Sequence, residues 1–304
     1  MTKIPSNPPE PRKALRVIQG AAEIRTREDD ERPDVRYGAR LWAQLSLPYR
    51  DPGDVREWVR RNGSVTLRIQ PSPLSDIDGE ARYGYPFGVI PRYALLWMSH
   101  EAVVTQSPEL DLGDSLAEFL RKIGASTGGG ANRQRVTEQL RRLFGSTMRV
   151  EDVRREGDRW GVAGQAFNIA KGYDLWFNAD DRAGTAPLWG STVTLSRDYF
   201  EDVIAHPVPI DMAIARALRG SPMQLDIYVW LSHRYATLDA PVTIRWEALR
   251  KQFGSKTANV RKFRQQFRQH VAVVLAVYPA ARIDVTESGV TLYPSPPSVD
   301  RRLT

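Results

Sequence analysis

The stretch PVTIRWEALRKQFGSKTANVRKFRQQFRQHVAVVLAVY, Pro241–Tyr278, carries the strongest structural signal of the chain. Residues 241–245 alternate in polarity and predict a short strand, and residues 246–253 predict a short helix that stops at Gly254. Over residues 255–277 apolar side chains recur at steps of three and four, which predicts a long helix with one buried stripe. The predicted stripe consists of Val260, Phe263, Phe267, Val271 and Val274.

The residues on either side of this stretch complete a known order of elements. Before it, Ser221 followed by proline is a typical helix start, and the apolar pattern extends that helix over residues 222–236. After it, residues 282–286 and 290–293 alternate around a glycine-containing turn and predict a hairpin. Helix, strand, short helix, long basic helix and hairpin is the order of a winged-helix domain.

A weaker copy of this unit lies earlier in the chain. Leu96–His100 (LWMSH) resembles Val229–His233 (VWLSH), and Leu116–Gly124 resembles Trp246–Gly254. The two matches occur in the same order and at nearly the same offset, so we expect one domain type to occur twice.

The remaining elements follow from the same patterns. Helices of the first copy are predicted over residues 92–104, 116–123 and 132–144, and its strands over 109–112, 148–155, 159–170 and 173–177. Ahead of this copy we expect strands at 39–47 and 64–70 and a helical turn at 55–61. The second copy is preceded by a predicted strand at 191–195 and helices at 197–205 and 211–218.

The net charge of the 304-residue chain lies at one end. The chain has 43 Lys and Arg against 36 Asp and Glu, a net charge of +7. Residues 241–304 hold 11 of the basic residues and only 4 of the acidic ones, so the whole excess falls there. Such asymmetry indicates a polyanionic partner for this end, most often nucleic acid.

The predicted long helix has the composition of a helix that reads DNA. Between Ser255 and His270 there are five Lys or Arg and no acid, and polar side chains lie opposite the buried stripe. Arg can pair with guanine and Gln with adenine through two hydrogen bonds, while residues at the helix margins meet phosphates. The expected base contacts are Arg261, Lys262, Gln265, Gln269 and Ala258. The expected phosphate contacts are Ser255, Lys256, Thr257, Arg264, Arg268 and, from the hairpin, Arg282.

The corresponding helix of the first copy, predicted over residues 132–144, resembles a DNA-binding helix less clearly, because Glu138 offsets its basic residues. This helix either contacts phosphates or belongs to a domain that mainly contacts protein. The candidates for DNA contact here are Arg133, Arg135, Arg141 and Arg142.

Several kinds of active site are excluded or disfavoured. The chain has no cysteine, and its four histidines are far apart, so no local metal-binding motif exists. The string Gly254–Thr257 (GSKT) lacks the glycine that precedes lysine in a phosphate-binding loop. The acidic runs at Asp29–Glu31 and Asp180–Asp181 lie in apparent tail and linker segments. We therefore expect no enzyme, no cofactor and no metal.

The chain shows no membrane or export signal. Its longest apolar run is Val271–Val277, too short to span a bilayer, and its N-terminal residues lack the apolar core of a signal peptide. We expect a cytoplasmic protein.

Several long strings of this sequence resemble the RepA-type replication initiators of broad-host-range plasmids. The strings are YGYPFGVIPRYALLW (Tyr83–Trp97), SPEL (Ser107–Leu110), LWGSTVTLS (Leu188–Ser196), HPVP (His206–Pro209) and WEALRKQFG (Trp246–Gly254). They occur in the family's order, and the resemblance covers about residues 80–295.

This resemblance implies a non-enzymatic initiator with two tandem winged-helix domains. Such proteins bind directly repeated double-stranded sequences (iterons) at a plasmid origin, help to open the DNA, and recruit the host initiator and the replicative helicase. In related initiators a homodimer, formed largely through the first domain, represses its own promoter and limits copy number, and the monomer is active at the origin.

We therefore expect an α+β protein with two tandem winged-helix domains. The predicted division is a disordered arm at 1–36, a first domain at 37–178 for assembly, a linker at 179–190, a DNA-binding domain at 191–296 and a tail at 297–304. The alternative is a winged-helix transcriptional regulator without a replication role. A DNA-nicking enzyme is a third hypothesis, which the exclusions above disfavour.

Overall fold

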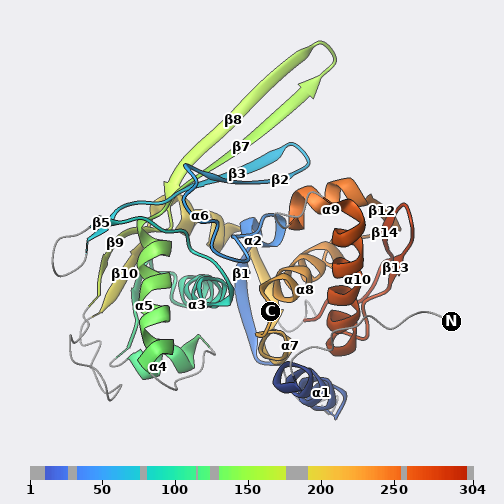
Figure 1. Cartoon of the computed structure of the whole chain (residues 1–304), viewed down its shortest axis with the longest axis horizontal. Coiled ribbons are helices and arrows are strands. Elements are labelled where there is room, and N and C mark those ends of the chain that lie inside the picture. The colour runs from blue at the N-terminus through green and yellow to red at the C-terminus, as the bar shows by residue number, and fades with distance from the viewer. Residues whose placement is uncertain are drawn as a thin grey trace.

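A computed structural model describes residues 11–26, 33–75, 81–113, 116–123, 130–175, 191–254 and 259–299. Within these ranges helices combine with antiparallel sheets, which confirms the predicted α+β class. Figure 1 shows helices of the first copy on the left and of the second copy on the right, with a long hairpin above them. No helix in the described ranges is long and apolar enough to cross a membrane.

The second copy folds in the predicted order. Helix α8 (Pro222–Tyr235) is capped at its N-terminus by Ser221, whose side chain accepts a hydrogen bond from the Gln224 amide. The next elements are β12 (Val242–Arg245), α9 (Trp246–Phe253), α10 (Val260–Val277), β13 (Ile283–Val285) and β14 (Gly289–Leu292). The strands form one antiparallel sheet in the order β12–β14–β13, so the hairpin pairs with the strand that precedes α9.

The start of the long helix differs from the prediction. Helix α10 begins at Val260 rather than near Ser255, because Asn259 has an extended backbone and its side chain accepts hydrogen bonds from the next amides. Residues 255–258 lie outside the described residues.

The first copy keeps the helix order but changes the sheet. Its elements are α3 (Val89–Thr105), β6 (Glu109–Asp111), α4 (Leu116–Lys122), α5 (Gly130–Gly145), and the hairpin β7 (Thr147–Glu156) and β8 (Arg159–Asn168). Strand β6 pairs with β10 (Thr192–Leu195), which also pairs with β9 (Ala170–Asp174). The predicted elements are therefore present, but in this copy the strand before α4 lies in a different sheet from the hairpin.

The hairpin instead extends a four-stranded sheet. Strands β2 (Trp58–Asn62) and β3 (Val65–Gln70) pair with it in the order β2–β3–β7–β8. The predicted helical turn at 55–61 is therefore wrong: half-buried Trp58 and Arg60 alternate with exposed Val59 and Arg61, which is the period of a strand. A short pair, β4 (Leu74–Ser75) and β5 (Ala81–Arg82), follows.

The predicted strand at 39–47 is also wrong. Strand β1 (Val35–Ala39) ends at Ala39, and the chain turns into helix α2 (Arg40–Gln44). The reason is tertiary: α2 packs against α8 and buries Ala43, while the Trp42 indole donates a hydrogen bond to the Tyr199 hydroxyl at 3.0 Å.

The N-terminal arm contains a helix. Residues 11–26 form α1 (Pro11–Thr26), which packs against α10 and α7 (Met212–Ala217). A Cβ at Gly20 would collide with the Ala217 side chain, so glycine permits this close helix crossing. The predicted disorder is therefore wrong for residues 11–26 and for Val35 and Arg36, which lie in β1, while residues 1–10 and 27–32 lie outside the described residues.

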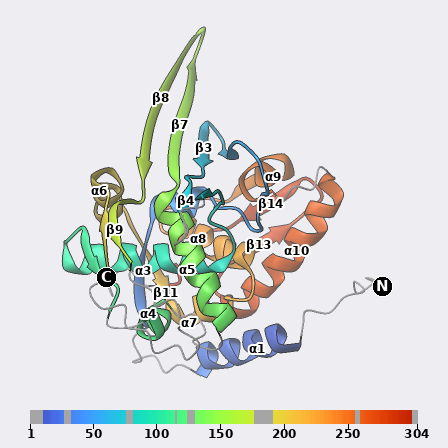
Figure 2. The ribbon, with the colours of Figure 1, turned by 60° about the vertical axis from the view of Figure 1, so that its left-hand side comes forward.

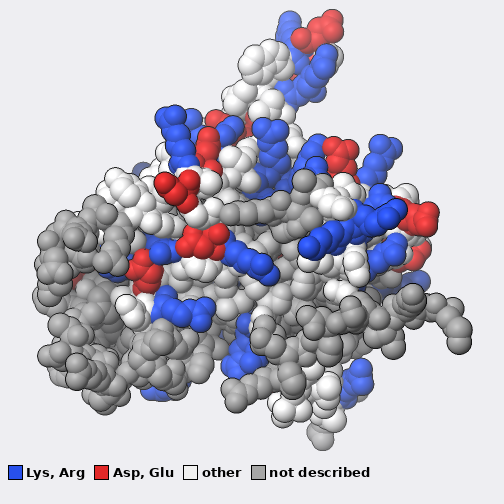
Figure 3. Space-filling view, viewed as in Figure 1, with Lys and Arg blue, Asp and Glu red and all other residues white. Residues whose placement is uncertain are grey.

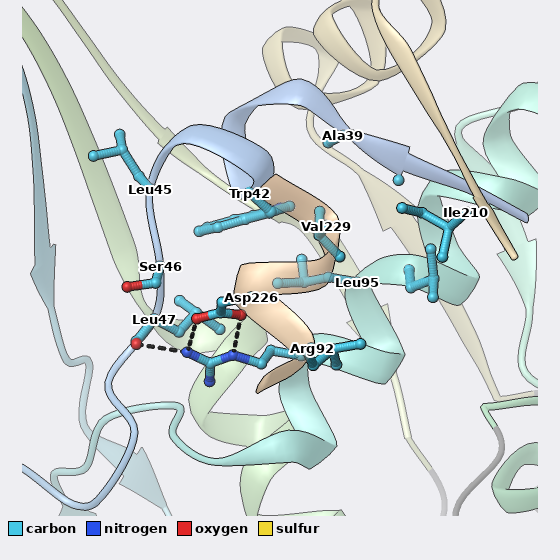
Figure 4. Close-up of a pocket in the computed structure, with 13 residues that line it drawn as sticks. Ala39, Trp42, Leu45, Ser46, Leu47, Arg92, Leu95, Ile210, Asp226 and Val229 are labelled. Atoms are coloured by element: carbon cyan, nitrogen blue, oxygen red, sulfur yellow. Dashed lines mark hydrogen bonds and ion pairs between the residues drawn. The ribbon is translucent and has the colours of Figure 1, made fainter. Parts of the chain in front are cut away.

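Several long-range contacts join the copies, and a strand pair and a buried ion pair are among them. Strand β1 packs on α3 and pairs with β11 (Pro207–Asp211), which follows α6 (Arg197–Ala205) and precedes α7 and α8. In addition, Arg92 on α3 forms a buried bidentate ion pair with Asp226 on α8, with N–O distances of 2.7 and 2.8 Å. Figure 4 shows this pair beside a small apolar cavity that Trp42, Leu47 and Val229 also line.

Candidate nucleic-acid interface

The first turn of α10 has a defined cap. The Asn259 side-chain oxygen accepts hydrogen bonds from the amides of Arg261 (2.9 Å) and Lys262 (3.3 Å). This cap holds the backbone of the first turn, and both basic side chains are exposed there. In helix-turn-helix proteins, residues at the N-terminal end of the recognition helix reach the base edges.

The back of α10 is a packed aromatic and aliphatic surface. Phe263, Phe267, Val271 and Val274 are at most 2% exposed, which confirms these members of the predicted stripe, whereas Val260 is only half-buried. The Phe267 ring lies 5.4–6.0 Å from the rings of Phe253, Phe263 and Trp246. This packing fixes the rotation of the helix and therefore which side chains it presents outward.

The front of α10 is cationic and rich in amides. Arg261, Lys262, Gln265 and Gln269 are exposed, as the helical wheel predicts, and Arg268, which the wheel places nearer the core boundary, is exposed as well. Figure 3 shows Lys and Arg side chains along the upper part of the molecule, over the regions of α9, β2 and the hairpin β7–β8, with fewer acidic side chains among them.

Two arginines of α10 lie over Trp246 of α9, and one of them also contacts the hairpin β13–β14. The guanidinium groups of Arg264 and Arg268 lie 5.7 and 6.0 Å from the centre of the Trp246 ring. Arg268 also donates a hydrogen bond to the Thr286 carbonyl at the hairpin turn (3.1 Å), and so does the Trp246 indole (3.1 Å). The structure therefore brings two predicted phosphate-binding residues together over the Trp246 ring, and it places Arg268 at the hairpin turn.

Arg282 lies elsewhere. It precedes β13 at the base of the hairpin, where the Tyr293 amide bonds to its carbonyl and its guanidinium lies 5.8 Å from the Tyr293 ring. It does not share the hairpin turn with Arg268. The predicted contacts Ser255, Lys256, Thr257 and Ala258 lie outside the described residues.

The candidate residues of α5 in the first copy are partly engaged within the protein. Arg142 forms ion pairs with Glu138 (2.9 Å) and Asp51 (3.2 Å), and Arg141 donates a hydrogen bond to the Ser75 carbonyl. Arg135 is exposed, and the side chain of Arg133 lies outside the described residues. Among the side chains that the structure describes, Arg135 on α5 and Arg261 and Lys262 on α10 are exposed and form no ion pair with one another or with any other described side chain.

Two structural features of this region escaped the sequence analysis. Asn259 directly before an apolar-periodic segment is a cap signal, but the expected start near Ser255 hid it. Arg60 on β2 donates a hydrogen bond to the Gly254 carbonyl at the end of α9, and stacks over Trp58 at 4.5 Å. No local pattern predicts a contact between residues so far apart in the sequence.

His100, His233 and His270 are half-buried side chains. Burial lowers the pKa values of His100, His233 and His270, with Arg36 and Arg234 adding to the effect at the first two. Among the described residues, no group of three or more His, Cys, Asp or Glu side chains could hold a metal ion.

The family of the chain is decided by its central region. The family model described as plasmid encoded RepA protein matches residues 85–248, more than half of the chain. The chain belongs to this family. The matched region runs from just before α3 into α9, which confirms the resemblance stated above, whereas α10 and the hairpin β13–β14 lie beyond it.

Solved structures show a more distant likeness. Two crystal structures of domains 2 and 3 of RctB align with 76% and 83% of this chain and with 82% and 94% of their own chains. The sequence identities are 11% and 9%, and the TM-scores are 0.46 and 0.45. No curated protein matches the sequence.

Loss of the Asn259 cap is expected to weaken both the helix and the predicted DNA contact of its first turn. Asn259→Ala should lower the free energy of unfolding by about 1 kcal/mol and loosen the turn that carries Arg261 and Lys262. Urea unfolding and binding to duplex DNA measure the two effects. Asn259→Ser is the control, because serine can still cap; equal losses in both variants would contradict the role of the cap.

His100 is expected to make stability depend on pH. Its pKa is lowered to about 4 from 6.5, so between these values the unfolded chain binds a proton that the folded chain excludes. The contribution of neutral His100 to the free energy of unfolding is therefore fully present above about pH 6.5, and it is lost as the pH drops towards 4. Urea unfolding across this range should show a shallower decline in the free energy of unfolding for His100→Gln than for the wild type. Identical declines would contradict the assignment of this pH dependence to His100.

Proposed function

We propose that this protein initiates plasmid replication by binding repeated double-stranded sequences at a plasmid origin. The single observation that carries the proposal, beside family membership, is the exposed cationic and amide-bearing face of α10 over its buried back. A helix fits the major groove of DNA, where Arg and Gln can distinguish guanine and adenine. The hydrogen bond of Arg268 to the hairpin turn supports a further contact of this turn with the flanking DNA backbone.

We further infer two tandem winged-helix domains. The order α8–β12–α9–α10–β13–β14 and the sheet β12–β14–β13 support this for residues 191–296. For residues 37–178 the helix order and the hairpin support it, although β6 pairs outside the hairpin sheet. The ion pairs of Arg142 make this side chain a poor candidate for a duplex contact from α5, and the assembly role of the first domain rests on the family resemblance.

The remaining parts of the proposal rest on the family resemblance. The protein acts in the cytoplasm without enzymatic activity or cofactor, helps to open the origin, and recruits the host initiator and the replicative helicase. A dimer represses the promoter of its own gene, and the monomer acts at the origin.

Replication in trans tests this function. A plasmid that carries only the cognate origin repeats should replicate when the intact protein is supplied from elsewhere. Failure with soluble protein and the correct origin would overturn the proposal. Binding only to an inverted repeat at a promoter would favour the transcriptional regulator, and nicking of supercoiled origin DNA in the presence of Mg²⁺ would favour the enzyme.

Substitutions on α10 should separate base contacts from phosphate contacts. Arg261→Ala and Gln265→Ala are each expected to weaken binding to the cognate repeat by about 1–3 kcal/mol while leaving binding to random duplex nearly unchanged. Arg268→Ala should weaken binding to both DNAs and reduce the salt slope by about 1.

Titrations of cognate and random duplexes at several salt concentrations measure these effects. Lys122→Ala on α4 is the control, because Lys122 pairs with Glu118 (3.3 Å) on a helix far from α10 in Figure 1. Equal losses of affinity for cognate and random DNA in all three α10 variants would contradict this separation of base contacts from phosphate contacts.

A further inference from the structure

The sheet β2–β3–β7–β8 has two unlike faces. Its register places Leu67, Ile69 and Met148 on the inner face, where all three are fully buried. The residues between them point to the other side of the sheet, because side chains alternate along a strand. We call this other side the outer sheet face and define it by Arg61, Arg68, Arg149, Arg155, Trp160 and the exposed valines of the hairpin.

The outer sheet face is cationic across three strands. Arg61 lies on β2, Arg68 on β3, and Arg149 and Arg155 on β7, and the register sets Arg68 directly opposite Arg149. Like charges in this position are unfavourable unless something offsets them. Glu151 lies 3.3 Å from Arg68 and 3.7 Å from Arg149, and Glu57 lies 2.8 Å from Arg68. Four arginines against two carboxylates leave the face positive.

The same face becomes apolar and aromatic towards the tip of the hairpin. Strand β3 ends its pairing at Asp152, and β7 and β8 continue as a two-stranded ribbon away from the body (Figures 1 and 2). On this ribbon Val153, Trp160 and Val162 are 46%, 74% and 54% exposed, and Trp160 lies directly opposite Arg155. An exposed cluster of this kind, unlike a single exposed residue, indicates a binding surface.

We propose that the outer sheet face binds an unpaired nucleic-acid strand. Arginines on the sheet would contact phosphates, and the Trp160 indole with the neighbouring Arg155 guanidinium would stack on a base. Sheet faces that combine aromatic and basic side chains bind single strands in this way, with little sequence preference. The bases of a duplex are stacked on one another, so only an unpaired strand offers a free base face to an exposed indole.

The position of the sheet agrees with this role. Strand β2 lies beside α9, and Arg60, on the inner face of β2, donates a hydrogen bond to the Gly254 carbonyl shortly before α10. The outer sheet face therefore belongs to a sheet that contacts the end of α9, the helix that precedes α10 in the chain. The inference rests on the proposed function in one respect, because opening of an origin is what would supply the unpaired strand.

Binding to an oligothymidylate of about 20 nucleotides tests the proposal. Fluorescence anisotropy of the labelled strand should show binding by the wild type, roughly tenfold or greater loss for Trp160→Ala, and near wild-type affinity for Trp160→Phe, which keeps a stacking ring. Arg155→Ala should weaken binding and reduce the salt slope by about 0.7. All three variants should bind the cognate duplex repeats as the wild type does.

Arg154→Ala provides the matched control. Arg154 neighbours Arg155 but points to the opposite face, where it pairs with Asp152 at 2.6 Å. Its substitution should leave the oligothymidylate affinity within about twofold of the wild type. An equal loss of oligothymidylate affinity in Arg154→Ala and Arg155→Ala would overturn the proposal. Binding would then depend on the net charge of the hairpin and not on the side chains of the outer sheet face.

Two other results would also overturn it. One is unchanged oligothymidylate binding in both Trp160→Ala and Arg155→Ala. The other is a loss of self-association in Trp160→Ala, seen by sedimentation, without a loss of strand binding, which would assign the face to contact between copies of this chain. Trp160-dependent strand binding in a protein that ignores the duplex repeats would support the strand site and contradict the proposed initiator function.

Discussion

Replacing Arg92 by alanine is expected to lower the free energy of unfolding by about 3–5 kcal/mol. The side chains of Arg92 and Asp226 are only 6% and 9% exposed, and the substitution leaves the carboxylate buried without its partner. Arg92 also donates hydrogen bonds to the carbonyls of Leu47 (2.7 Å) and Gly88 (2.6 Å), which lose their donor as well. Because α3 and α8 both depend on this pair, unfolding in urea should show the loss for the whole chain.

Two comparisons make this prediction specific. Arg197→Ala removes an ion pair of the same length, 2.7 Å to Glu201, but its side chains are 86% and 56% exposed, so stability should hardly change. The double variant Arg92→Met/Asp226→Leu should recover much of the lost stability, because apolar residues can replace a buried pair. A loss in Arg92→Ala no larger than in Arg197→Ala would contradict the role of burial.

Replacing Phe267 by alanine should cost a similar amount, about 3–5 kcal/mol. The ring is fully buried and touches the rings of Trp246, Phe253 and Phe263, so its removal opens a cavity behind α10. The helix that presents Arg261 would then lose its fixed rotation. We expect a lower midpoint in urea and weaker binding to cognate duplex DNA in the folded fraction.

Gln269→Ala is the control on the same helix. Gln269 is exposed, so its substitution should change stability by less than about 0.5 kcal/mol. The stability of Phe267→Leu should lie between those of Phe267→Ala and Gln269→Ala, because leucine fills part of the cavity. Similar stabilities for Phe267→Ala and Gln269→Ala would contradict the packing of α10 described above.

The parts of the fold that the sequence predicts are those set by local patterns. The buried stripe of α10 follows from apolar spacing, and the start of α8 from the cap Ser221. The parts that it misses depend on distant partners. Helix α1 forms against α7 through the Gly20–Ala217 contact, and α2 interrupts a strand-like pattern because it packs on α8.

In the candidate site, too, the sequence predicts the features that local patterns set and misses those that depend on distant partners. A helical wheel places Arg261 and Gln265 on the exposed face correctly, since rotation about one helix is a local property. The attachment of Arg268 to Thr286 and the separate position of Arg282 depend on how the hairpin folds back on α10. The Arg92–Asp226 pair joins residues 134 positions apart, and neither residue alone signals a partner.

A footprint on the origin region of the plasmid tests the central claim most directly. The account predicts protection of several directly repeated, evenly spaced duplex sites by the wild type, and loss of this protection for the double variant Arg261→Ala/Gln265→Ala, while Lys122→Ala protects as the wild type does. Protection that survives the loss of both α10 side chains, or the absence of any protected repeats, would contradict it.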